Sequence, residues 1–206
     1  MACYIVGAGE FFGFESMPLA QDFVIAADGG LEACRRAGVV PHRILGDFDS
    51  LGYVPQEGNV LQVPVEKDDT DMMLAVKLGL SEGCTDFYIY GGTGGRLDHT
   101  IANLQTLLYL TEQGAKGWLY DKMGKFTVVK NGKLELPAKK EGIFSVFAMN
   151  TAAVGVTIRG GQYGAENMTL LEGLPMGVSN HFVGNPVSIE VAEGTLLVGV
   201  IDEGKN

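Results

Sequence analysis

The sequence predicts an α/β fold, with an N-terminal parallel sheet flanked by helices and then a small all-β sandwich or barrel-like domain. Two observations predict it. The first part alternates short apolar runs with helical patterns, which is typical of a parallel sheet covered by helices. From residue 124 the chain consists almost entirely of short strands and glycine-marked turns. We therefore expect two domains, residues 1–123 and 124–206.

The elements of the first domain follow from hydrophobic periodicity. Buried parallel strands are short apolar runs, and these are found at 4–6, 23–27, 43–45, 60–63, 87–90 and 117–120. Helical patterns are found at 31–37, 72–80 and 101–110. The first of these helices ends before Gly38 and Pro41, which is a helix stop signal.

The second domain is read from strand patterns alone. Its strands are predicted at 126–129, 142–148, 154–158, 168–171, 187–191 and 196–201. Glycines separate most of these runs, which fits tight turns between short strands.

Composition and charge exclude several classes of protein. With 46% hydrophobic and 19% charged residues, the chain can bury a core, and its 30 glycines have no three-residue period, so disorder and collagen are excluded. The formal charge of −10 repels nucleic acid. Five lysines between residues 125 and 140 are interpreted as a solvated hairpin and not as a basic patch.

Cysteine usage and hydropathy indicate the compartment. Cys3, Cys34 and Cys84 lack metal-ligand spacing, and we expect buried free thiols in a reducing cytoplasm. No apolar run approaches the roughly 18 to 20 residues of a membrane span, so no membrane partner is expected.

Aspartates gather after the predicted strands. Seven of the eleven fall in four short places. These seven are Asp28, Asp47, Asp49, Asp68, Asp69, Asp71 and Asp98. Because the carboxyl ends of parallel strands share one edge, where open α/β sheets bind ligands, most of these carboxylates should converge there. A hard divalent cation such as Mg²⁺ offsets such charge.

Two of the acidic groups have a structural alternative. Asp47 and Asp49 flank Phe48, which we expect to turn into the core, but both aspartates could instead bond to their own backbone in a turn. In the group before the second helix, one aspartate could cap the helix; if that is Asp69, then Asp71 lies in the first turn.

Residues 91–99, Gly-Gly-Thr-Gly-Gly-Arg-Leu-Asp-His, form the strongest phosphate-binding signal. Glycines allow close backbone approach, the following helix adds its dipole, and Arg96 offers a planar fork to phosphate oxygens. The alternative is a flexible turn in which Asp98 caps the helix. A second glycine pair, Gly7 and Gly9, resembles a dinucleotide fingerprint imperfectly, because Pro18 interrupts the helix that should follow.

Together the segments 27–30, 46–50, 68–71 and 91–99 closely resemble, in the same order, the motifs of the thiamine pyrophosphokinase family. The resemblance is strong over residues 24–105 and weaker at 157–163 and 177–180. It implies transfer of a diphosphoryl group from ATP to the hydroxyl of thiamine, with Mg²⁺ as cofactor. It also implies a homodimer with active sites between the two domain types of different subunits.

Carried over by position, the resemblance assigns roles to particular residues. The catalytic set is Asp28, Asp47, Asp49, Asp71 and Arg96, with Asp47, Asp49 and Asp71 as metal ligands. The nucleotide-binding set is Thr70, Gly92, Gly94, Gly95, Arg96 and Asp98. Ser179 and Asn180 match the pair associated with the thiamine pyrimidine. The 157–163 segment departs from the family pattern, and Tyr163 and Phe182 are both candidates for an aromatic that stacks on thiamine.

Three other functions remain open from the residues. A related scaffold transfers diphosphate to a hydroxymethylpterin, and a nucleotide or thiamine sensor would bind without chemistry. A glycosyltransferase would use Asp47 and Asp49 but leave the glycine and arginine loop unexplained.

Overall fold

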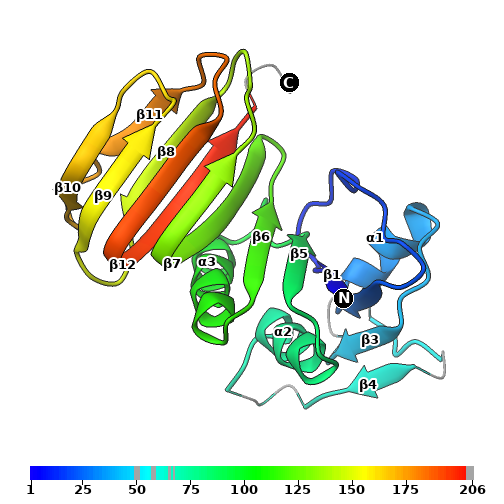
Figure 1. The fold of residues 1–206 in the computed structure, drawn as a ribbon. Coiled ribbons are helices and arrows are strands. Elements are labelled where there is room, and N and C mark those ends of the chain that lie inside the picture. Colours follow the sequence, from blue (N-terminus) through cyan, green and yellow to red (C-terminus); the bar gives the residue numbers. More distant parts are fainter. Residues whose placement is uncertain (49–51, 57–58, 65, 67, 203–206) are drawn as a thin grey trace. The chain divides into compact units, whose positions relative to one another are not determined.

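The computed structural model describes residues 1–48, 52–56, 59–64, 66 and 68–202. The chain divides into two compact units, Met1–Lys122 and Met123–Asn206. Figure 1 shows a sheet with helices in the first unit and strands alone in the second. This is the predicted fold class, a helix-flanked parallel sheet followed by a β domain.

The first unit contains a parallel sheet. Its strands are β1 (Ala2–Val6), β2 (Phe23–Ala27), β3 (Arg43–Gly46), β4 (Val60–Gln62), β5 (Asp86–Tyr90) and β6 (Lys116–Tyr120). They pair in the order β6-β5-β1-β2-β3-β4, and every pairing among them is parallel. The chain runs from β1 outward to β4 and then crosses back to β5, so the strand order reverses between β1 and β5.

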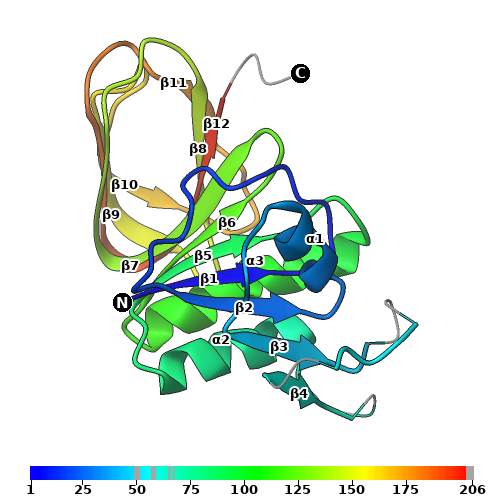
Figure 2. The same cartoon turned by 90° about the vertical axis from the view of Figure 1, so that its right-hand side faces the viewer.

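Helices cover both faces of this sheet. Figure 2 shows α1 (Gly30–Arg36) on one face, with α2 (Asp71–Ser81) and α3 (Leu97–Glu112) on the other. Alternation along each strand decides which side chains meet which helix. Val6, Val24 and Ala26 share the core on the α1 face, where Phe11 and Phe14 from the 7–22 segment pack on Tyr90.

The helix boundaries differ from those predicted, chiefly in α3. It begins at Leu97, four residues before the predicted start, and Leu97 itself is exposed. The hydrophobic pattern missed this first turn because its side chains face outward or line the pocket described below. Residues 7–22 contain no helix, so the fingerprint-like glycines Gly7 and Gly9 do not open one.

The second unit consists of antiparallel strands. They are β7 (Gly124–Leu136), β8 (Ile143–Ala148), β9 (Ala153–Arg159), β10 (Ala165–Leu170), β11 (Gly177–His181) and β12 (Val187–Ile201). One edge of β12 pairs with β7 over nearly its whole length. Along its other edge, residues 188–193 pair with β9 and residues 196–201 pair with β8. The β9-β10 and β8-β11 pairs therefore branch from one long strand.

Three predictions for this unit are corrected. The predicted strand 126–129 is part of the 13-residue β7, so most of the lysine-rich stretch is one long strand and not a hairpin by itself. The predicted strands 187–191 and 196–201 are both parts of β12, joined across a register shift between Val191 and Thr195. Strand β11 was not predicted, because its sequence GVSNH has little apolar content.

Two further expectations concern the cysteines and the membrane. Cys3, Cys34 and Cys84 are free and buried, as expected. Over the described part of the chain, no helix is long and apolar enough to cross a membrane.

Candidate active site

The candidate site is a cavity of about 330 Å³ at the carboxyl ends of the parallel strands of the first unit. Its walls include the segment after β1, the residues that follow β2 and β3, the start of α2 and the loop between β5 and α3. Ligands of open α/β sheets bind where the strand order reverses, which in this unit is the crevice between β1 and β5.

Two glycine loops form the floor of this crevice. The amide of Gly7 donates to Tyr90 O, that of Gly9 to Gly91 O and that of Glu10 to Thr93 O, at 2.8, 2.8 and 3.0 Å. A Cβ on Gly9 would lie 2.4 Å from Thr93 O, and one on Gly91 would lie 2.4 Å from Gly7 O. Only glycine permits this backbone-to-backbone contact, which holds the loop after β5 in place.

Asp28 lies at the end of β2 in a left-handed conformation, with φ of 51°. Its amide donates to Leu45 O at 2.7 Å, and its side chain is 8% exposed. A Cβ on Gly46 would lie 3.1 Å from Asp28 Cα, so the ends of β2 and β3 approach closely. Strained aspartates of this kind persist where the surrounding structure holds them.

Asp47 lines the cavity, and Phe48 anchors the segment that carries it. Phe48 is 2% exposed, packs in the core on the α1 face and has φ of 62°. It turns into the core as predicted, although from a left-handed residue and not from an extended strand end. Asp49, the second predicted metal ligand of this segment, lies outside the described residues.

The start of α2 places one aspartate of three at the cavity. Thr70 is the N-cap, and its hydroxyl accepts from Met73 N at 3.2 Å, so Thr70 takes the capping position considered above for Asp69. Asp69 instead pairs with Lys77 at 2.6 Å. Thr70 and Asp71, the first helical residue, both line the cavity.

Arg96 and Asp98 form an ion pair at the start of α3. The guanidinium donates from Nη2 to Asp98 Oδ2 at 2.6 Å and from Nε to Oδ1 at 3.1 Å, and this pairing lowers the pKa of the Asp98 carboxyl. Both side chains are largely exposed, so the pair adds little stability. Phosphate oxygens can therefore recruit Arg96 at small cost. Arg96 is itself the N-cap residue, so Asp98 does not cap α3.

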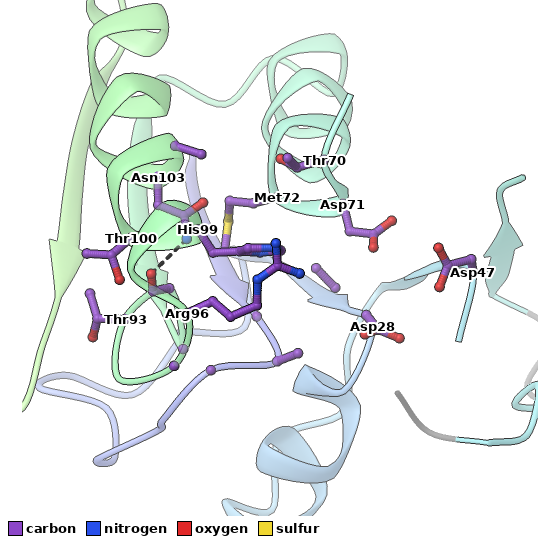
Figure 3. Close-up of a pocket in the computed structure, with 18 residues that line it drawn as sticks. Asp28, Asp47, Thr70, Asp71, Met72, Thr93, Arg96, His99, Thr100 and Asn103 are labelled. Atoms are coloured by element: carbon purple, nitrogen blue, oxygen red, sulfur yellow. Dashed lines mark hydrogen bonds between the residues drawn. The ribbon is translucent and has the colours of Figure 1, made fainter. Parts of the chain in front are cut away.

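Figure 3 shows how charge is divided across the cavity. Asp28, Asp47 and Asp71 lie on one side, Thr93, Thr100 and Asn103 lie on the other, and Arg96 lies between them. Gly92 and Gly95 also line the cavity, whereas Gly94 packs against Glu10. The arrangement provides an acidic side for a cation and a neutral, hydrogen-bonding side.

Several residues of the cavity wall were not predicted from the sequence. Gly7 and Gly9 were interpreted only as a dinucleotide fingerprint, although two glycines directly after a strand also indicate close backbone approach. Thr93, Thr100 and Asn103 had no signal of their own, because a threonine or asparagine beside a helix start is common in any fold.

The predicted thiamine residues, Ser179 and Asn180, both lie on β11 in the second unit. Ser179 is exposed, has φ of 60° and donates its amide to Ser145 Oγ at 3.1 Å. Asn180 is 7% exposed, and its amide group bonds to both the N–H and the carbonyl of Tyr163 at 3.0 and 2.6 Å. In this structure the Asn180 side chain holds the turn that presents Tyr163.

The two aromatic candidates for stacking on thiamine, Phe182 and Tyr163, differ in solvent exposure. Phe182 is 3% exposed and packs on Phe144 with ring centroids 5.1 Å apart. Tyr163 is 61% exposed. Only Tyr163 has a ring face available to a ligand.

The donor set of the acidic side fits a magnesium ion in chemical type. Mg²⁺ is commonly held by one or two carboxylates together with substrate phosphates and water. Asp47 and Asp71 supply two such carboxylates on one wall. Within the described ranges no three acidic, histidine or cysteine side chains form a ready-made metal cluster.

The fold and cavity define an α/β protein with a ligand crevice at the carboxyl ends of its parallel strands, followed by a β domain. The profile of the thiamin pyrophosphokinase catalytic domain matches residues 14–119, and that of the thiamin pyrophosphokinase vitamin B1 binding domain matches residues 133–196. The chain therefore belongs to the thiamine pyrophosphokinase family, whose enzymes are ATP-dependent diphosphotransferases.

Individual relatives agree with this assignment. The chain is 26% identical over 181 residues to the thiamine pyrophosphokinase of Bacillus subtilis, covering 84% of this chain and 85% of that protein. It is 27% identical over 183 residues to thiamin pyrophosphokinase 1 of Caenorhabditis elegans, covering 81% and 74%. The crystal structure of the Bacillus subtilis enzyme has the same fold, with a TM-score of 0.86 and 22% identity over 98% of this chain and 100% of that chain.

Proposed function

We propose that this chain forms thiamine diphosphate and AMP from thiamine and ATP in the cavity of its first unit. The hydroxyl oxygen of thiamine bonds to the β-phosphorus, the bond from that phosphorus to the α-β bridging oxygen breaks, and the hydroxyl proton leaves. The observation that carries the proposal is the gathering of three aspartates, Arg96 and a backbone-locked glycine loop around one cavity.

Each part of the cavity has a role that its chemistry supports. Asp47 and Asp71, with Asp49, would hold Mg²⁺, which neutralises charge on the β- and γ-phosphate oxygens when bound. When ATP binds, the guanidinium of Arg96 releases the carboxylate of Asp98 and donates to phosphate oxygens in its place. The loop at Gly92 and Gly95 holds the nucleotide, and the start of α3 beside Arg96 orients the triphosphate for in-line attack.

Asp28 completes the acidic side from the end of β2. Its buried carboxylate strengthens the local field, which favours the cationic thiazolium of thiamine as well as a metal ion. Thr70 caps the N-terminus of α2 through its hydroxyl, and this cap fixes the first turn of the helix and with it Asp71.

The acceptor site is assigned to the second unit. Its match to a vitamin B1 binding domain favours thiamine over a pterin alcohol as acceptor. Ser179 and Asn180 are proposed to recognise the pyrimidine, Asn180 in part by holding the Tyr163 turn. The exposed ring of Tyr163 is a suitable stacking surface for the substrate.

We also propose a homodimer in the cytoplasm. Leu171, Leu174, Met176 and Val178 are each about half exposed in one short stretch of the second unit, which is an unusual surface for a monomer. Buried free thiols fit a reducing compartment. Light scattering on the purified chain tests the dimer, and a single species at 21.9 kDa would contradict it.

One assay tests the reaction itself. AMP release from ATP is measured with and without thiamine and with and without Mg²⁺, and we expect it only when both are present. The variant Asp47→Asn removes one carboxylate charge from a half-buried position, and we expect turnover to fall at least 100-fold with little change in melting temperature. AMP release by Asp47→Asn at the wild-type rate would contradict the metal assignment.

A further inference from the structure

Asn103 on α3 is held in one orientation by the glycine loop. Its side chain is 6% exposed, and Nδ2 donates to Gly92 O at 2.7 Å. An amide has donors at one end and only acceptor capacity at the other. Because the nitrogen is committed to a carbonyl, a flipped amide would set two oxygens against each other, so Oδ1 must lie on the opposite side.

That opposite side is the cavity. In Figure 3 the dashed bond leaves the amide nitrogen of Asn103, while its oxygen is directed toward Met72, another wall residue. No donor in the described ranges bonds to Oδ1. An acceptor in a pocket wall loses free energy when water is excluded unless the ligand supplies a donor.

The division of charge indicates which part of the substrate supplies that donor. The phosphates belong with the three aspartates, which lie across the cavity from Asn103, and with Arg96, which lies between the two sides. Beside Asn103 the walls are neutral, with Thr93 and Thr100 on the same side. The uncharged part of the nucleotide, its nucleoside, is the part that matches this side.

We propose that Oδ1 of Asn103 accepts a hydrogen bond from the nucleoside of ATP, either from the 6-amino group of the base or from a ribose hydroxyl. Asn103 then has two functions: it holds the glycine loop through Gly92 and it selects the nucleotide. The inference rests on the proposed function, since it takes ATP as the donor substrate.

The first experiment uses the wild-type chain and measures nucleotide binding by calorimetry in the presence of Mg²⁺ and without thiamine. ATP is compared with purine riboside triphosphate, which lacks the 6-amino group, and with 2′-deoxy-ATP and 3′-deoxy-ATP. We expect one analogue to bind about threefold to tenfold more weakly than ATP, since it lacks the donated hydrogen bond. Equal binding of all four nucleotides would overturn the proposal.

The second experiment removes the acceptor. In Asn103→Leu, the analogue that bound more weakly to the wild type should bind as well as ATP, because the Oδ1 acceptor is gone for both nucleotides. Asn103→Asp keeps an acceptor oxygen but loses the bond to Gly92, so it should bind all nucleotides more weakly and still discriminate. Asn103→Asp also keeps the test open where Asn103→Leu does not fold.

The matched control is Thr106→Val, one turn further along α3. Thr106 is 1% exposed, and its hydroxyl bonds to Ala102 O at 3.0 Å within the helix, away from the cavity. This variant should discriminate between ATP and its analogue as the wild type does.

Two results would overturn the assignment. One is an unchanged difference in affinity between ATP and its analogue in Asn103→Leu, and the other is a shift in KM for thiamine in place of a shift in nucleotide affinity. Binding without thiamine keeps this outcome separate from a failure of the transfer reaction.

Discussion

The substitution Gly9→Ala tests whether contact between the two glycine loops shapes the cavity. A Cβ at this position would lie 2.4 Å from Thr93 O and 2.7 Å from Gly91 O. Ordinary contact begins near 3.4 Å, so the two loops must separate by about 1 Å. The segment after β1 and the loop after β5 would both be displaced.

The magnitude follows from the hydrogen bonds that span the contact. Separation weakens the bonds Gly9 N to Gly91 O and Glu10 N to Thr93 O, at about 1 kcal/mol each. Reduced freedom of the unfolded chain offsets up to about 1 kcal/mol. The net loss of about 1 to 2 kcal/mol lowers the melting temperature by roughly 2 to 8 °C.

The effect on catalysis should exceed the effect on stability. A displacement of about 1 Å in groups that orient the phosphates reduces kcat/KM for ATP by roughly 10- to 100-fold. The assay is AMP release at saturating thiamine, with folding checked by circular dichroism. Gly132→Ala is the matched control, because a Cβ there meets only Lys130 O, at the ordinary contact distance of 3.4 Å. A folded Gly9→Ala enzyme with kcat/KM for ATP within twofold of wild type would refute the reasoning.

Three other substitutions test separate parts of the molecule. Arg96→Ala should raise KM for ATP about tenfold or more while KM for thiamine stays nearly constant, and equal shifts in both would contradict the phosphate role. Asn180→Asp places a carboxylate against Tyr163 O, so it should raise KM for thiamine and leave KM for ATP unchanged in steady-state assays, whereas a change in KM for ATP alone would contradict it. Burial raises the pKa of Cys34 from 9.0 to about 12, so the unfolded thiol releases its proton first and the free energy of unfolding should fall as pH rises from 9 toward 12. Urea titrations at pH 8 and 10.5 should show a smaller decrease in the free energy of unfolding for Cys34→Ala than for the wild type. Identical decreases in the two proteins would refute this cause.

The first unit was the more predictable part of the fold. Strands β1, β2 and β3 are buried on both faces, so each reads as a continuous apolar run. All six predicted strands overlap observed ones. In the second unit the register shift within β12 and the polar sequence of β11 break the alternation on which strand prediction depends. Local periodicity could not show that two predicted strands were one.

The individual site residues divide in the same way. Asp28, Asp47 and Asp71 could be selected because each follows a recognisable strand or precedes a helix. The ion pair of Asp69 with Lys77 could not, since it depends on how the loop before α2 folds back on that helix. Asn103 was missed because its role appears only when Gly92 O lies beside it.

The sequence by itself determined the fold class, the family resemblance and the positions where carboxylates and glycines follow strands, since these depend on local periodicity and ordered motifs. Only the tertiary structure decided that β1 lies beside β5, because strand order depends on pairing between residues far apart in the chain. That neighbourhood brings Gly9 against Thr93 and turns a weak fingerprint into one wall of the cavity.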